Sequence, residues 1–319
     1  MHGMVATMVP PAERLPDALP TDRLTATGRP VPPVRSELRR IPDLRNAGTV
    51  IGAWVQIALV VGGAVWIDRW WAWPVAVLLM GRSFALLLIL GHEAAHRLLF
   101  SRKPVNEFVG KWLLAYPGFV PFDLYRRSHM AHHKDEMGPD EPDIPLYAGY
   151  PITRASLRRK LTRDALGSSG WKNLKPLGAA LVKRSSRRTA MPILVTQLVI
   201  FAVFLAIGWP QLYLVLWILP WMTSWRVINR LRSIAEHGGM TRSSDRRETT
   251  HHVRQRVVSR FWMVPYNTGW HLAHHVDSGI PWRNLPKLHS ELEAAGWVTP
   301  PLEWPSYIAL WSALSSRPS

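Results

Sequence analysis

The chain has 319 residues and no cysteine, and its 39 Lys and Arg residues outnumber 22 Asp and Glu, giving a formal net charge of +17. The lack of cysteine excludes a disulfide scaffold, a cysteine nucleophile and iron–sulfur or cysteine-ligated zinc sites. The excess of positive charge predicts a negatively charged partner, which could be nucleic acid, anionic lipid or an acidic protein.

Residues 1–48 differ in composition from the rest of the chain. They contain eight prolines and seven arginines and show little hydrophobic periodicity. Such a composition is typical of segments that cannot bury enough apolar surface to fold. We therefore expect a disordered, basic N-terminal tail over 1–48 and one folded domain over 49–319.

Four apolar segments follow, at about 51–67, 70–90, 191–207 and 209–225. Their lengths match or approach the number of helical residues that crosses a bilayer, and Arg82 is their only charged residue. Asp68 and Arg69 alone separate the first pair, and little more than Gly208 separates the second. The sequence therefore predicts an all-α integral membrane protein with four transmembrane helices in two hairpins.

The distribution of positive charge predicts the orientation of these helices. Of the 39 Lys and Arg residues, 37 lie in the tail, in 97–190 or in 226–319, which two hairpins place on one side. Loops rich in Lys and Arg remain cytoplasmic. We expect a multi-pass protein of a bacterial inner membrane with both termini cytoplasmic. The alternative, two buried hairpins of a soluble protein, explains less well the tryptophans that cluster near the segment ends.

Nine of the thirteen histidines occupy four short motifs, all on the predicted cytoplasmic side. Histidines at positions i, i+3 and i+4 share one face of a helix, and neutral imidazole is the commonest metal-ligating side chain. Nine imidazoles are too many for one ion and suit two. Imidazole without thiolate is compatible with zinc, copper, iron or nickel. The candidate ligands are His92 and His96 in HEAAH, His129, His132 and His133 in HMAHH, the lone His237, and His271, His274 and His275 in HLAHH.

This order of motifs resembles the membrane fatty acid desaturase superfamily. The setting of the third motif, Asn267-Thr-Gly-Trp-His271 followed by Pro281-Trp282, is similar to that of the acyl-lipid desaturase branch, as is Asp140-Glu-Pro-Asp143. The resemblance implies a four-span bundle under a cytoplasmic helical cap, in which the nine histidines ligate two non-haem irons. It also implies O2 as co-substrate and the removal of two hydrogens from an acyl chain.

The resemblance extends to partners and to residues around the ligands. It implies an acyl chain carried on CoA, carrier protein or membrane lipid, and a separate ferredoxin-, rubredoxin- or cytochrome b5-type electron donor. Asn267, Glu236 and Glu93 are candidates for hydrogen bonding to the ligands. Some relatives have asparagine four residues before the lone histidine, where this chain has Ser233.

Alternative functions remain open at this point. A hydroxylase or ketolase of a lipid, hydrocarbon or carotenoid would use the same ligands. His92-Glu93-Ala-Ala-His96 also matches the motif of zinc metalloproteases, in which the glutamate is the general base. A transporter would place ionisable residues inside the membrane, where only Arg82 lies. The basic cluster within 154–163 favours contact with anionic lipid rather than nucleic acid.

Four further histidines are not assigned as ligands, and one of them, His2, belongs to the N-terminal tail. His251 and His252 lie in a polar stretch, and we expect them to face solvent or to support the ligands. We expect His289 to have a structural role.

Overall fold

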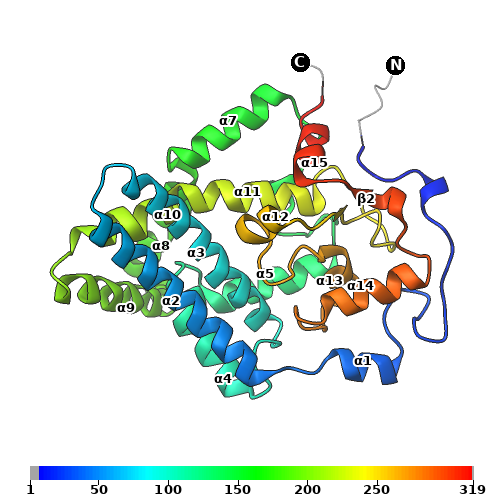
Figure 1. Cartoon of the computed structure of the whole chain (residues 1–319), viewed down its shortest axis with the longest axis horizontal. Helices are drawn as coiled ribbons and strands as arrows, with labels where there is room; N and C mark the ends of the chain where they lie inside the picture. The colour runs from blue at the N-terminus through cyan, green and yellow to red at the C-terminus, as the bar shows by residue number, and fades with distance from the viewer. Residues whose placement is uncertain (1–6, 318–319) are drawn as a thin grey trace. The chain divides into compact units, whose positions relative to one another are not determined.

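The computed structural model describes residues 7–317, which form mainly helices (Figure 1). The chain divides into two compact units. Unit 1 comprises Met1–Ile41, Arg127–Arg158 and Arg230–Ser319, and unit 2 comprises Pro42–Arg126 and Arg159–Asn229. Three helices contain a boundary between the units, namely α5 (Phe122–Lys134), α7 (Arg154–Ala165) and α11 (Ser224–His237).

Unit 2 contains the long apolar helices. Among the described residues, α2 (Asp43–Ile67), α3 (Ala72–Ala95) and α9 (Arg184–Ala206) are long and apolar enough to cross a membrane. They confirm the helices that the apolar segments at 51–67, 70–90 and 191–207 predict. The most apolar stretch of α3 is 67% buried, against 28% in α2 and in α9, so α3 is the inner helix of this unit.

The fourth apolar segment is not one continuous helix, so the predicted helix over 209–225 is wrong in this respect. It comprises the π-helical η3 (Tyr213–Ile218), α10 (Leu219–Met222) and the beginning of α11. Pro220 lacks a backbone N–H, and Thr223 leaves the helical region with φ −117° and ψ −88°. Thr223 therefore separates α10 from α11, whereas η3 continues into α10 with helical dihedral angles at Ile218 and Leu219.

The remaining helices of unit 2 surround α3. It packs against α2, α10, η3 and the π-helical η2 (Val109–Ala115), which continues from α4 (Lys103–Phe108). Polar side chains of α2 donate hydrogen bonds to backbone carbonyls elsewhere in the unit. The Asn46 amide donates to the Leu99 carbonyl at 2.8 Å, and the Trp54 indole donates to the Leu113 carbonyl at 3.0 Å. Helix α8 (Ser168–Val182) contacts α9.

Unit 1 is built from short elements around one apolar core. Its elements in addition to parts of α5, α7 and α11 are η1 (Ala12–Arg14), α1 (Pro32–Leu38), α6 (Ile144–Tyr147), β1 (His252–Val253), α12 (Val257–Trp262), α13 (His271–Val276), α14 (Leu285–Ala294), η4 (Pro300–Leu302), β2 (Glu303–Trp304) and α15 (Tyr307–Leu314). Strands β1 and β2 pair in parallel, with His252 opposite Glu303. Side chains of α13 and α14 form the centre of the core cluster.

The N-terminal segment belongs to this core, which corrects the prediction of a disordered tail. Leu24 and Leu38 are 1% and 4% exposed and join the cluster around α13 and α14. The Arg35 guanidinium donates to the Asp277 carboxylate at 2.5 and 3.0 Å. Residues 43–48 are already the first turns of α2. Proline limits the freedom of the unfolded segment, so a few buried leucines suffice to order it. Residues 1–6 lie outside the described part.

Candidate metal centre

Three elements of unit 1 carry seven of the nine motif histidines. Helix α5 presents the second motif in its last two turns, α11 ends on His237, and α13 consists almost entirely of the third motif. Every residue of α13 is buried, and His237 is 2% exposed. The i, i+3, i+4 spacing therefore aims the imidazoles of each motif in one direction, as the sequence predicts.

The Nε2 atoms of these histidines face one another. His129 and His274 each place Nε2 close to Nε2 of His133, at 3.1 and 3.0 Å. His237 and His275 each place Nε2 3.0 Å from Nε2 of His271. Two nitrogens at right angles on one ion, each about 2.1 Å from it, are about 3.0 Å apart. The spacing therefore fits imidazoles that share metal ions. His132, His237 and His275 form one group that could hold an ion, and His133, Glu136 and His275 form another.

The opposite ring nitrogen, Nδ1, contacts an acceptor in four of these histidines. Nδ1 of His132 contacts the Glu141 carboxylate, and Nδ1 of His237 donates to the Thr249 carbonyl at 2.9 Å. Nδ1 of His271 lies 3.6 Å from the carboxylate of Glu236, one of the three residues predicted to support the ligands. A proton held on Nδ1 leaves the Nε2 lone pair directed inward, which is the tautomer that binds a metal.

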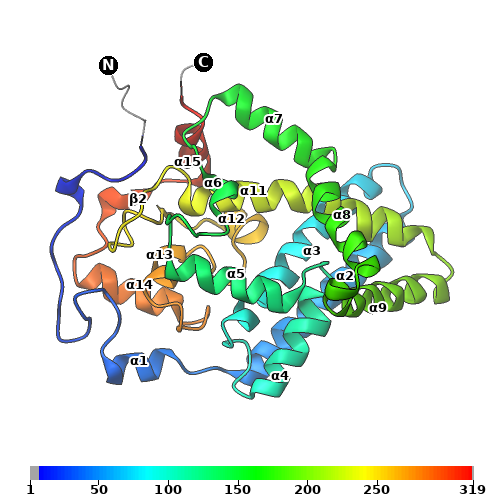
Figure 2. The same ribbon diagram turned by 180° about the vertical axis from the view of Figure 1, so that it is seen from behind.

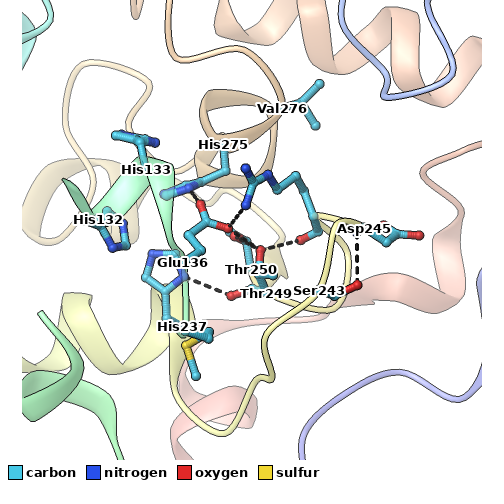
Figure 3. A network of polar contacts seen from close by, with 12 residues as sticks. His132, His133, Glu136, His237, Ser243, Asp245, Thr249, Thr250, His275 and Val276 are labelled. Carbon is cyan, nitrogen blue, oxygen red and sulfur yellow. Dashed lines mark hydrogen bonds and ion pairs between the residues drawn. The ribbon is translucent and has the colours of Figure 1, made fainter. Parts of the chain in front are cut away.

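Glu136 supplies the fourth acceptor and connects two segments of unit 1. One carboxylate oxygen contacts Nδ1 of His275. The other accepts from the Arg246 guanidinium at 2.6 Å and from the Thr249 hydroxyl at 2.5 Å. Figure 3 shows the carboxylate between His275 and the loop that carries Thr249. The side chain of Glu136 is 1% exposed, so its charge acts in a poorly hydrated site.

Burial keeps two of the clustered histidines neutral. It lowers the pKa of His237 and of His271 well below 6.5. Neighbouring histidines lower the pKa further, His132 in the case of His237, and His237 and His274 in the case of His271. Both imidazoles are therefore uncharged at neutral pH, and a neutral imidazole is the form that ligates a metal.

The first motif lies in unit 2. His92 and His96 end α3, with ring centroids 4.7 Å apart, and the chain leaves the helix at Arg97 with φ 62°. Glu93, another predicted supporting residue, is buried in the same turn. Asn267, the third, lies in unit 1 in the turn before α13 with φ 59°. Its amide makes no hydrogen bond to a histidine within residues 7–317, so the structure does not place it as sequence reasoning expects.

Sequence reasoning missed three acceptors in unit 1. Glu136 follows His133 by three residues, and Glu141 belongs to the motif Asp140-Glu-Pro-Asp143. Both therefore lie near the second motif in the chain. A glutamate within ten residues of a histidine motif is the sequence feature that could have indicated them. Thr249 offers no such signal, since it acts through its backbone carbonyl and its hydroxyl.

Within residues 7–317, the histidines outside the motifs are buried rather than solvent-facing. Burial lowers the pKa of His251 to about 4, and Nε2 of this residue contacts the Gly238 carbonyl at 2.8 Å. Burial and the neighbouring His289 lower the pKa of His252 to about 3, although Glu303 lies 3.7 Å away. His289 stacks on Trp270 with ring centroids 5.0 Å apart, in keeping with its predicted structural role.

Comparison with known proteins gives consistent matches. The family model described as fatty acid desaturase matches residues 68–305. Dihydrorhizobitoxine desaturase of Bradyrhizobium elkanii is 26% identical over 74% of this chain and 72% of its own length. The sn-1 oleoyl-lipid 12-desaturase of Anabaena variabilis is 25% identical over 76% of each chain. The sn-1 acyl-lipid omega-3 desaturase (ferredoxin) of Nostoc sp. (strain 36) is 29% identical over 32% of this chain and 27% of its own. Because the family model covers well over half of the sequence, the chain belongs to the fatty acid desaturase family and is an oxidoreductase.

Proposed function

We propose that the protein is an O2-dependent fatty acyl-lipid desaturase with two non-haem irons. The proposed iron ligands are the nine motif histidines, His92, His96, His129, His132, His133, His237, His271, His274 and His275. The observation that carries the proposal is the set of Nε2–Nε2 distances of 3.0 to 3.1 Å in unit 1. His92 and His96 join the set because the family resemblance assigns them.

Bound iron would supply the activation of O2 that side chains cannot provide, for removal of two hydrogens from an acyl chain. The protein's own residues would hold the imidazoles in place. Glu136, Glu141 and the Thr249 carbonyl keep protons on Nδ1, and Glu236 lies close enough to His271 to assist. Such partners orient ligands and raise their basicity. The nitrogen donor set, without thiolate, suits iron among other metals.

We infer a multi-pass arrangement in a bacterial inner membrane, with the histidine motifs in a cytoplasmic helical cap. Three apolar helices support it, and η3 with α10 would complete the fourth crossing. The uneven distribution of Lys and Arg supports the orientation. An apolar substrate partitions into the bilayer, and this explains why the metal centre would accompany membrane helices.

We also propose an acyl lipid as substrate and a separate protein as electron donor. The names of two relatives, an oleoyl-lipid desaturase and an acyl-lipid desaturase with ferredoxin, support this choice. CoA or carrier protein as acyl carrier, and a rubredoxin or cytochrome b5 as donor, are the alternatives to test.

Two measurements test the proposal. Elemental analysis of reconstituted protein should find about two irons per chain, and one zinc without iron would instead favour a metalloprotease. Expression in a host that lacks the activity, followed by mass spectrometry of its lipids, should show acyl chains that have lost two hydrogens. A gain of one oxygen would contradict desaturation and indicate a hydroxylase, and an added carbonyl a ketolase.

A further inference from the structure

The region from residue 165 to residue 235 contains no Asp or Glu but nine Lys and Arg residues. Six of the nine lie on two consecutive helices of unit 2 or on Lys183, the residue that joins them. Helix α8 leads through Lys183 into the first two turns of α9, with which it is in contact (Figure 2). Residues 168–190 are hereafter the basic hairpin. Its basic residues are Lys172, Lys175, Lys183, Arg184, Arg187 and Arg188.

All six side chains are exposed, and five of them are available for an external partner. Arg187 is the exception, because its guanidinium donates to the Leu181 carbonyl at 3.0 Å and thereby caps α8. No carboxylate within residues 7–317 forms an ion pair with the other five. A dense positive surface without internal acidic partners repels itself, and binding of anions relieves that repulsion.

Apolar side chains are exposed on the same hairpin. Trp171 is 57% exposed and Val182 is 80% exposed, although both lie on or beside turns that carry lysine. Trp171 and Lys175 are four residues apart and Val182 is seven further on, so the three side chains share the exposed face of α8. Tryptophan and lysine on one exposed face are typical of helices at the membrane interface, where the ammonium group extends toward the headgroups. A soluble acidic partner would match the charge but would not account for the exposed apolar groups.

The hairpin leads directly into a membrane helix. The uncharged part of α9 begins at Thr189, one residue after Arg188, and continues to the end of the helix at Ala206. At about 1.5 Å per residue, the guanidinium-bearing turns lie within about 10 Å of the apolar stretch along the helix axis. Lipid headgroups occupy the corresponding depth at the surface of a bilayer.

We propose that the basic hairpin is a binding site for anionic phospholipids of the leaflet in which α9 begins. Lys172, Lys175, Arg184 and Arg188 bind the headgroup phosphates, and Trp171 and Val182 lie beside them at the boundary between headgroups and acyl chains. The site is independent of the metal centre, so its test does not rely on desaturase activity.

Native mass spectrometry of the full-length protein, titrated with phosphatidylglycerol or phosphatidylcholine in detergent, tests this site. We expect the first phosphatidylglycerol to bind more tightly than phosphatidylcholine. Each basic side chain near a membrane surface contributes about 1 kcal/mol, or about fivefold in affinity. The variant Lys172→Gln, Lys175→Gln, Arg184→Gln, Arg188→Gln should therefore lose at least tenfold in phosphatidylglycerol affinity and keep its affinity for phosphatidylcholine.

Two further variants separate a local site from general charge and from misfolding. The charge-retaining variant Lys172→Arg, Lys175→Arg, Arg184→Lys, Arg188→Lys should bind phosphatidylglycerol like the wild type. A control that removes four exposed arginines of unit 1, at positions 14, 39, 40 and 317, should do so too. Equal affinity for both lipids, an unaffected glutamine variant, or an equal loss in the control would overturn the proposal. Displacement of the lipid by millimolar inorganic phosphate would also overturn it, because it would indicate a site for a soluble anion.

Discussion

Replacing Glu136 by glutamine tests whether the buried carboxylate holds His275 in the metal-binding tautomer. The amide is isosteric, and its oxygen can still accept from Arg246 and Thr249, which lie 2.6 and 2.5 Å from the carboxylate. Its NH2 group then faces Nδ1 of His275, where donor opposes donor. The imidazole avoids this conflict by moving its proton to Nε2, and a protonated Nε2 cannot bind a metal.

The expected loss of metal affinity follows from the hydrogen bond between Glu136 and His275. A hydrogen bond to a charged group contributes about 1.5–3 kcal/mol in a folded protein. Loss of such a partner beside a metal ligand typically lowers metal affinity by about 10- to 100-fold. We therefore expect the affinity of Glu136→Gln for iron to be about 10- to 100-fold lower than that of the wild type.

The assay is competition for iron with a chelator of known affinity, followed by measurement of iron per chain. The matched control is Asp245→Asn, which breaks the 2.7 Å ion pair with Arg247 in the same loop without touching a histidine. The control should keep wild-type iron affinity. If Glu136→Gln holds iron as tightly as the wild type across the chelator series, the carboxylate does not set the tautomer.

Three other substitutions give distinct outcomes. His237→Ala should abolish turnover and lower bound iron, whereas His251→Ala should keep its iron; full activity and metal content in the first variant would show that His237 is not a ligand. Leu24→Ala should cost about 2–5 kcal/mol of stability because Leu24 is 1% exposed, while Leu44→Ala, at a residue 90% exposed, should leave the melting temperature unchanged. The pKa of His252 is about 3 in the folded chain and 6.5 in the unfolded chain. The unfolded chain therefore takes up a proton first as the pH falls below 6.5, and the free energy of unfolding decreases until the pH reaches about 3. At pH 5 the loss is about 2 kcal/mol, and His252→Gln should abolish that part of the pH dependence of thermal melting.

Patterns that repeat at short range predicted the helices and the clustered histidines. Apolar runs of the length of a membrane helix predicted the positions of α2, α3 and α9, since a helix that crosses a bilayer needs about 20 predominantly apolar residues. The spacing within the second and third motifs placed their histidines on one helical face each. Both signals lie within a few residues of one another, so no tertiary information was needed.

Contacts between distant segments could not be predicted in the same way. Glu136 meets Arg246 across 110 positions, and Nδ1 of His237 meets a backbone carbonyl that any residue type could offer. The interruption of the fourth apolar segment depends on Thr223, whose dihedral angles depart from the helix without a signal in its residue type. Composition alone likewise gave the wrong state for the N-terminal segment, whose few apolar residues are buried by unit 1.

The N-terminal segment has a consequence for the metal centre, because it packs on the helix that carries the third motif. Gly28 has φ 77°, and a Cβ there would lie 3.2 Å from the side chain of Val276, so the segment approaches α13 closely. Arg35 binds Asp277 two residues after His275. Helix α13 has only six residues, and a helix so short is not stable by itself. The contacts from Gly28 and Arg35 therefore help to hold α13 helical, and the positions of three imidazoles depend on a segment that contains none of the histidine motifs.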